Sequence, residues 1–274
     1  MKKTIAFVWL ITSLLATAGT VAASENEFPH RARFKDVPVV EISELKNRLN
    51  DVVIVDVRSK YEFDTLHIKG AINVPLASID FATRIQALSN NGGKKIVMYC
   101  NGGTCKKSYK AVHKAKQAGV KNCVAFDGGI YNWASTHPAH SVLLGQSPMQ
   151  ADAFIDNKRF KTRMLSAGEF ESRLGPRAQI LDIRDRAQRD TQLFPFREKR
   201  AQLDEMDRIK QIVMESKRGN KTLLVYDKVG KQVRWFQYFL EREGIRNYYF
   251  MKGGSEGYYE AKLGKFRIKV PEKS

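Results

Sequence analysis

The chain has 274 residues, 43% of them hydrophobic, which is enough for one large or two ordinary domains and excludes general disorder. Its formal net charge is +18, from 47 basic and 29 acidic side chains. The basic residues are spread along the whole chain, with no dense run interleaved with aromatic residues, so no nucleic-acid partner is expected. A basic surface would still attract small anions to a cleft.

Residues 1–23 have the features of a secretory signal peptide. Lys2 and Lys3 precede an apolar stretch, which ends in small residues at Ala23. An uncleaved membrane anchor is the alternative, because no charge occurs between Lys3 and Glu25. The small residues favour cleavage after Ala23, which predicts a periplasmic protein without membrane contact once the peptide is removed.

The remaining chain repeats itself. "VVIVDVRSKYEF" recurs as "AQILDIRDRAQRD", and "KIVMYCNGG" recurs as "LLVYDKVG", at a constant offset of about 126 residues. Each copy opens with a serine that is typical of a helix start, Ser43 or Ser166, and then alternates short apolar runs with helical patterns. We therefore expect an α/β fold with two related domains, residues 38–138 and 163–270, joined by a linker at 139–162, each domain a parallel sheet flanked by helices.

The run "KKIVMYCNGGTCKKSYKAVHKA" places Cys100 at the end of a predicted strand, just before a helix. In a parallel sheet, ligands bind beyond the carboxyl ends of the strands. The helix N-terminus and two lysines favour a thiolate, so the pKa of Cys100 is expected to lie below its ordinary value. The same loop would hold a small oxyanion against the sulfur. The expected anion-binding residues are Asn101, Gly102, Gly103, Thr104, Cys105, Lys106, Lys107 and Ser108.

These segments resemble the rhodanese family. "IVDVRSKYEFDTLHIKGAINVPL" (54–76) is similar to its first signature, and "YCNGGTCKKSYKA" followed by "FDGGIYNW" to its active-site loop and closing segment. The resemblance implies a sulfurtransferase in which Cys100 takes sulfur from thiosulfate or a similar small anionic donor, forming a persulfide. The sulfur would then pass to a thiol or to cyanide, without a cofactor. Asp56 and Arg58 would form an ion pair that supports the loop.

The loop departs from the family pattern Cys-x-x-Gly-x-Arg-Ser. It is two residues longer, and Cys105 stands where Arg is common. Loops of this length also resemble those of dual-specificity phosphatases and arsenate reductases, so oxyanion chemistry is an alternative. The loop has no arginine for bidentate phosphate binding, and Tyr99 replaces the phosphatase histidine, which favours sulfur transfer.

A third possibility is a thiol-redox or binding module, in which Cys100 and Cys105 form a disulfide. The third cysteine, Cys123, lies in a predicted strand and is expected to pack in the core. A metal site is not expected, because only two candidate ligands occur together, without a histidine pair.

The second copy has Asp227 where the first has the cysteine. A carboxylate is stable at a helix N-terminus but cannot carry sulfane sulfur. The second copy therefore resembles the inactive domain that tandem rhodaneses commonly carry, and is expected to support the first by packing. Its apolar residues Trp235, Phe236 and Phe239 predict a folded core.

Overall fold

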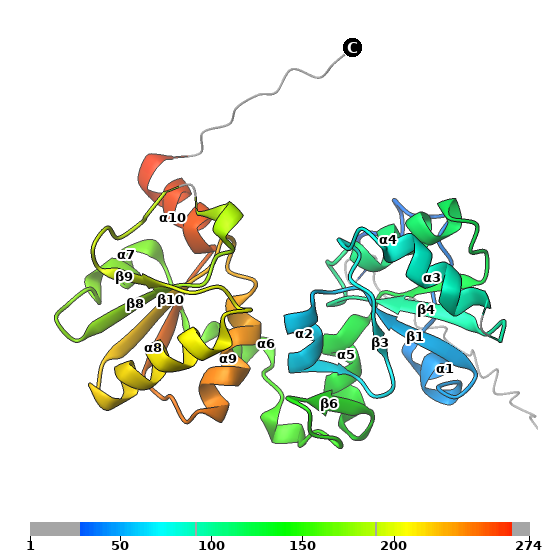
Figure 1. Cartoon of the computed structure of the whole chain (residues 1–274), viewed down its shortest axis with the longest axis horizontal. Helices are drawn as coiled ribbons and strands as arrows, with labels where there is room; N and C mark the ends of the chain where they lie inside the picture. Colours follow the sequence, from blue (N-terminus) through cyan, green and yellow to red (C-terminus); the bar gives the residue numbers. More distant parts are fainter. Residues whose placement is uncertain (1–27, 91, 190, 265–274) are drawn as a thin grey trace, which may run out of the picture.

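The computed structural model describes residues 28–90, 92–189 and 191–264; the predicted signal peptide lies outside them. The chain forms two parallel sheets, each flanked by helices and lying side by side (Figure 1). The predicted α/β fold class is confirmed. None of the helices in the described part of the chain is long and apolar enough to cross a bilayer.

The first sheet has the strand order β3-β1-β4-β5, and every pair in it is parallel. An isolated parallel bridge from Val39 to Ala125 extends it beyond β5. Asp56 pairs with Tyr99, so β1 and β4 end at the same level, and the residues after both strands meet at one edge. The strands are β1 (Val52–Asp56), β3 (Ile72–Asn73), β4 (Lys95–Tyr99) and β5 (Cys123–Phe126).

Helices cover both faces of this sheet (Figure 1). Val97 and Tyr99 of β4 pack with α1 (Ile42–Asn47) and α5 (Gly129–Thr136). The alternate residues of β4 pack with α3 (Phe81–Asn90) and α4 (Lys107–Gln117). Because both faces are buried, the strands have continuous apolar sequences, as parallel strands between helix layers do.

The second sheet repeats this arrangement. Its strand order is β7-β11-β10-β8-β9, and all pairs are parallel. The first sheet has the same order when it is read from its other edge: the bridge at Val39, then β5, β4, β1 and β3. Helices α7 (Ala167–Ser172) and α10 (Gly254–Leu263) pack on one face, and α8 (Met206–Arg218) and α9 (Val233–Arg242) on the other. The strands are β7 (Met164–Leu165), β8 (Ala178–Asp182), β9 (Glu198–Arg200), β10 (Thr222–Tyr226) and β11 (Tyr248–Met251).

The segment predicted as a linker, 139–162, is folded against the first sheet. β6 (Ser141–Leu143) pairs antiparallel with β2 (Leu66–Ile68), and Ile155 is buried in the core on the α5 side. Two 3-10 turns (Pro138–His140 and Ala151–Ala153) and α6 (Asn157–Lys161) complete the segment. It is therefore an ordered connection between the two halves of the chain. We call the residues that form and surround the first sheet the first half, and those that form and surround the second sheet the second half.

The helix-start predictions have mixed outcomes. Ser166 caps α7 in a capping box with Glu169, as predicted. The prediction for Ser43 was wrong, because Ser43 lies inside α1 and the N-cap is Glu41, which makes no side-chain cap bond. A second capping box, Ser59 with Glu62, begins α2 (Lys60–Thr65) between β1 and β2.

One predicted core residue of the second half belongs to the core of the first. Phe236 and Phe239 pack under the second sheet as expected. Trp235 instead joins the core on the α5 side of the first sheet, where its ring stacks on Tyr131 at 5.2 Å between centroids and 7° between planes. Tyr238, one turn further along α9, lies in the same core. Helix α9 therefore joins the two halves through a shared apolar cluster.

Candidate active site

Cys100 lies immediately after β4 and is fully buried. Its Sγ donates to the carbonyl oxygen of Cys105 at 3.3 Å and lies 3.7 Å from Ser108 Oγ. The backbone N–H groups of Gly102 and Ser108 point at its sulfur. The loop thus wraps around this one side chain, with amide dipoles directed at it.

The loop is closed by the two glycines at the start of α5, Gly128 and Gly129. Gly103 N donates to Asp127 O at 2.9 Å, and Ile130 N donates to Cys100 O at 2.9 Å. A Cβ on Gly129 would lie 2.3 Å from Gly102 N, and Gly129 has a φ of +60°. Both the space and the backbone conformation therefore require glycine at this contact.

Cys105 turns back toward Cys100, so that each thiol affects the pKa of the other. The N–H groups of Asn101 and Lys107 point at the sulfur of Cys105. All three cysteines of the chain are free thiols, and Cys105 is the only one that is not fully buried. The loop that was expected to bind an anion therefore surrounds two sulfur atoms.

The pKa values of the two thiols move in opposite directions. Burial and the neighbouring Cys105 raise the pKa of Cys100 well above its ordinary value. The hydrogen bond from Cys100, the two backbone N–H groups and the charge of Lys107 lower the pKa of Cys105 to about 6. The prediction of a lowered pKa for Cys100 was wrong, because the full burial of Cys100 disfavours its thiolate and the lowered pKa belongs to the less buried Cys105.

The lysines and Thr104 lie at the exposed side of the loop. The side chains of Lys106 and Lys107 are exposed, and Lys106 occupies the N-cap of α4 without a side-chain cap bond. The charge of Lys107 also helps to lower the pKa of Glu62, although burial opposes this shift. Two positive charges therefore face solvent beside the thiol pair, where an approaching anion would meet them.

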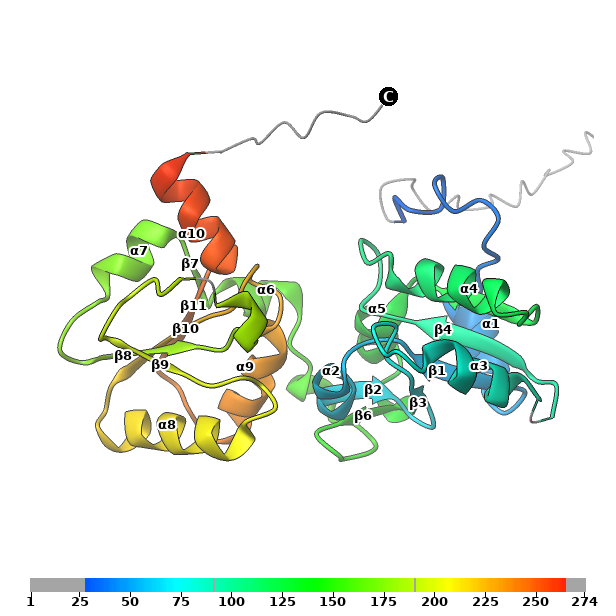
Figure 2. The ribbon, with the colours of Figure 1, turned by 45° about the horizontal axis from the view of Figure 1, so that its top comes forward.

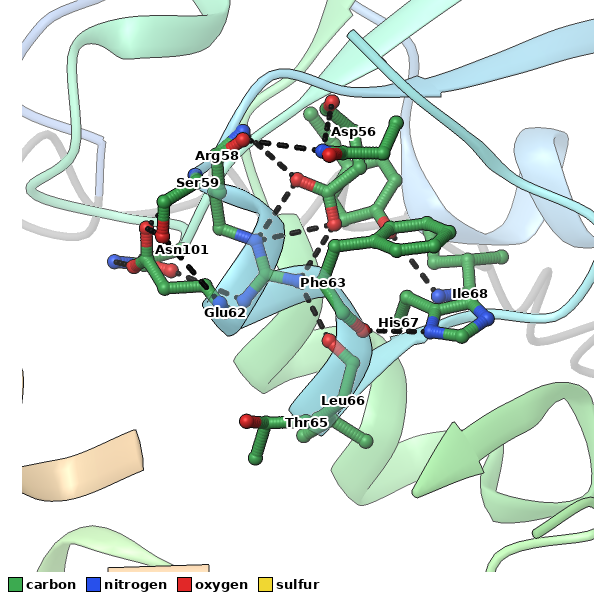
Figure 3. Close-up of polar contacts among 12 residues, drawn as sticks. Asp56, Arg58, Ser59, Glu62, Phe63, Thr65, Leu66, His67, Ile68 and Asn101 are labelled. Carbon is green, nitrogen blue, oxygen red and sulfur yellow. Dashed lines mark hydrogen bonds and ion pairs between the residues drawn. The ribbon is translucent and has the colours of Figure 1, made fainter. Parts of the chain in front are cut away.

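A buried ion pair supports the loop from the end of β1 (Figure 3). Arg58 Nε donates to Asp56 Oδ1 at 2.9 Å and Nη2 to Asp56 Oδ2 at 2.6 Å. The same guanidinium donates to Leu66 O at 2.5 Å and, through Nη1, to Asn101 Oδ1 at 3.4 Å. Asn101 Nδ2 in turn donates to Glu62 Oε1 at 3.2 Å. The first residue after Cys100 is therefore held by the Arg58 network.

The second half contains the same ion pair. Arg184 Nε donates to Asp182 Oδ1 at 3.0 Å and Nη2 to Oδ2 at 2.9 Å, and both residues are buried. This pair has no cysteine near it, since Asp227 stands at the end of β10. The repeated Asp-x-Arg pair thus belongs to the fold, and its link to Asn101 is what connects it to the site in the first half.

Sequence reasoning missed a second network, which joins the chain before α1 to the loop. Asp127 accepts two hydrogen bonds from Arg31, at 2.7 and 3.0 Å, and one from Tyr109 Oη at 2.5 Å. His30 Nε2 lies 2.9 Å from Thr104 O. Figure 2 shows this segment passing over the side of the molecule where α4 lies. The only sequence signal was the aspartate of "FDGG", whose partner lies 96 positions away.

Helix α9 of the second half also reaches the site. The guanidinium carbon of Arg58 lies 4.8 Å from the centre of the Trp235 ring. Arg234 lies 3.7 Å from the centre of Tyr131, whose N–H donates to Asn101 O at 3.3 Å. The wall behind the loop is therefore formed by both halves of the chain.

In the second half the corresponding loop is filled by its own side chain. The Asp227 carboxylate accepts hydrogen bonds from the backbone N–H groups of Gly230, Gln232 and Val233. Burial nevertheless raises the pKa of Asp227 above its ordinary value. The N–H groups that would bind an anion are thus already used within this loop.

Residues 41–136 match the Rhodanese-like domain family, and Cys100 and its loop lie within the matched residues. Among similar proteins, a tRNA uridine(34) hydroxylase from Cytophaga hutchinsonii is 32% identical over 106 residues, covering 38% of this chain and 33% of the relative. The HTH-type transcriptional regulator Rv0324 from Mycobacterium tuberculosis is 36% identical over 88 residues, covering 32% and 37%. The chain thus spans about a third of the length of these curated relatives.

Two solved structures are also similar. A thiosulfate sulfurtransferase from Pseudomonas aeruginosa is 18% identical with a TM-score of 0.39, and the match covers 82% of this chain and 43% of that one. The human single-domain sulfurtransferase TSTD1 is 27% identical with a TM-score of 0.30, covering 35% of this chain and 94% of that one.

Proposed function

We propose that this protein is a sulfurtransferase that moves sulfane sulfur from thiosulfate, or a similar small anionic donor, through a persulfide on Cys100. The observation that carries the proposal is the buried Cys100 thiol, hydrogen-bonded to Cys105 inside a loop of inward N–H groups and within a rhodanese-like domain. Thiol and cyanide acceptors follow from the same persulfide chemistry.

The geometry supports a simple first step. The neighbouring Cys105 thiolate accepts the proton of Cys100, and Cys100 Sγ attacks the outer sulfur of the donor. The bond between the two donor sulfurs breaks, and sulfite leaves with the electron pair. The N–H groups of Gly102 and Ser108 stabilise the persulfide anion, while Lys106 and Lys107 attract the donor.

Oxyanion chemistry of the phosphatase or arsenate reductase type receives less support. The loop contains no arginine for bidentate phosphate binding, and two of its N–H groups point at Cys105. The curated hydroxylase relatives match this chain over only a third of their length, so their activity does not enter the proposal.

We assign the second half a supporting role in this proposal, with the two halves as tandem domains of which only the first is active. Asp227 has no transferable sulfur and already satisfies the N–H groups of its loop. Residues 1–23 are proposed to direct the protein to the periplasm, where the mature chain would act.

Intact mass spectrometry before and after addition of thiosulfate, with assay of sulfite, tests the proposal. Release of one equivalent of sulfite by the wild-type protein, and none by Cys100→Ala, is the expected result. Cys123 lies at the start of β5 with its Sγ directed at Val120 O, away from the loop, so Cys123→Ala is the matched control and should release sulfite normally. Sulfite release by Cys100→Ala at the wild-type level would overturn the assignment.

A further inference from the structure

Cys105 is placed to do more than accept a proton. Each of the two thiols affects the pKa of the other, both cysteines are free, and the loop between them contains two glycines at positive φ. The Sγ of Cys100 already contacts the carbonyl oxygen of Cys105 at 3.3 Å, so the loop returns on itself at this point. No other cysteine is available to the pair, because Cys123 packs against Val120 and pairs with Ile96 at the start of β4, the end of the strand opposite to Cys100.

We propose that Cys105 is the first acceptor of the Cys100 persulfide, so that the protein reduces sulfane sulfur to sulfide and forms a Cys100–Cys105 disulfide. This inference rests on the proposed sulfur transfer and adds the fate of the sulfur. It assigns to Cys105 a chemical step in place of the anion-binding part expected from its position in the loop.

The step balances without an added oxidant. The Cys105 thiol gives the proton that it took from Cys100 to the outer sulfur of the persulfide, and the resulting Cys105 thiolate attacks Sγ of Cys100. The bond between Sγ and the outer sulfur breaks, and hydrosulfide leaves with the electron pair. The outer sulfur gains two electrons and the two cysteines lose two as their disulfide forms. Thiosulfate and the dithiol protein thus give sulfite, sulfide and the disulfide protein. A second turnover requires a dithiol reductant, from a small molecule or a partner protein, to restore both thiols.

Geometry and reactivity favour Cys105 over an external thiol. Cys100 is fully buried, so a thiol from solution must enter the loop to reach its sulfur. Cys105 is already beside it, and a group held in contact acts at a high effective concentration. Its thiolate also forms in the neutral range, since the pKa of Cys105 is lowered to about 6. The attacking thiol is then ionised while remaining a competent nucleophile.

A single-turnover experiment tests this. The full-length protein is reduced, freed of reductant without oxygen, and mixed with one equivalent of thiosulfate; sulfite, sulfide and intact mass are then measured at the end point. Wild type should release one equivalent each of sulfite and sulfide and lose the mass of two hydrogen atoms, with a Cys100–Cys105 link in its peptide map. Cys105→Ser should release sulfite but no sulfide and gain the mass of one sulfur atom. Cyanide added afterwards should give thiocyanate from Cys105→Ser and none from wild type.

The outcomes separate the two proposals. A wild-type protein that keeps the extra sulfur and both free thiols overturns the role of Cys105 and leaves sulfur transfer intact. Failure of every variant to release sulfite overturns sulfur transfer itself. Because end points are read, a slower first step in Cys105→Ser does not obscure its product. Cys123→Ala should match wild type throughout, and Cys105→Ala gives a second variant should the serine disturb folding.

Discussion

The ring of Trp235 lies 4.8 Å from the guanidinium carbon of Arg58, so a helix of the second half contacts the ion pair that supports the Cys100 loop of the first. Trp235 also stacks on Tyr131, whose N–H bonds the carbonyl of Asn101. Through these contacts the second half supports the Cys100 loop, even though its own Asp227 loop contains no sulfur atom.

Replacing Trp235 with alanine should therefore weaken both stability and sulfur transfer. Loss of a buried tryptophan ring is expected to lower the free energy of unfolding by about 3–5 kcal/mol. Sulfite release should slow as well, because Arg58 and Tyr131 lose the surface that holds them against Asn101. Urea unfolding and sulfite assay measure the two effects. Phe239→Ala removes a buried ring of α9 from the second core only, so equal sulfite rates in the two folded variants would contradict this account.

Gly129→Ala should disable the loop without touching a sulfur atom. The added Cβ would lie 2.3 Å from Gly102 N at a backbone φ of +60°, so the loop must shift. Displacement of about 1 Å can cost roughly a hundredfold in rate, and we expect sulfite release to fall by that order. Gly168→Ala in α7 is the control, because its Cβ would meet nothing within 4 Å. Normal turnover by Gly129→Ala would show that the glycine contact is dispensable.

Asp227→Ala should leave sulfite release unaltered and reduce stability. The carboxylate accepts three backbone N–H bonds at the start of α9, and loss of such a cap costs about 0.5–2 kcal/mol. Asp227→Asn retains an acceptor oxygen and should lose less. Thermal unfolding followed by circular dichroism compares the three proteins. Loss of turnover in a folded Asp227→Ala protein would mean that this carboxylate acts on the first site.

Alkylation of Cys105 should depend on pH with a midpoint near its lowered pKa of about 6, well under the ordinary value of 9.0. Only the thiolate reacts, so the rate should be low below this pH and reach its plateau above it. Removal of the hydrogen-bond donor in Cys100→Ala should move the midpoint upward. Peptide-resolved mass spectrometry after timed iodoacetamide treatment measures the rate. A midpoint near 9.0 in the wild type would contradict the lowered pKa of Cys105.

Lys106 and Lys107 should attract the donor anion and contribute little to the stability of the fold. Both are exposed near the N-terminus of α4, where positive charge opposes the helix dipole. Replacing both with alanine should raise the KM for thiosulfate and flatten its dependence on ionic strength, with thermal stability nearly unchanged. Arg208→Ala with Lys210→Ala removes the same charge from exposed positions on α8. An equal rise in KM in that control would show that overall charge alone attracts the donor.

The elements and the edge of the sheet where the site lies were predictable from local sequence. Apolar runs that end in a polar or sulfur residue identified β1, β4, β8 and β10, and the duplicated Asp-x-Arg identified the ion pair. These signals extend over a few adjacent residues, and the burial of parallel strands on both faces makes them strong.

The features that were missed depend on contacts between distant segments. The opposite pKa shifts of Cys100 and Cys105 depend on how far each sulfur is buried, which spacing alone does not give. Trp235 faces the first half because of how α9 docks, whereas its neighbour Phe236 on the same apolar helix faces the second sheet. Arg31 reaches Asp127 from before α1, and neither residue has a local partner that would have indicated the pairing.

The Asp227 loop has a consequence for how the molecule withstands chemical damage. Residues 227–233 contain neither cysteine nor methionine, and a carboxylate is inert to the peroxides that convert a thiolate to sulfinic acid. If Cys100 carries sulfur as proposed, its over-oxidation would end turnover, yet Asp227 would keep its bonds to the start of α9 and Trp235 its place against Tyr131. A protein aged by oxidation would therefore lose its activity well before it lost its shape, and inactive but folded molecules would accumulate.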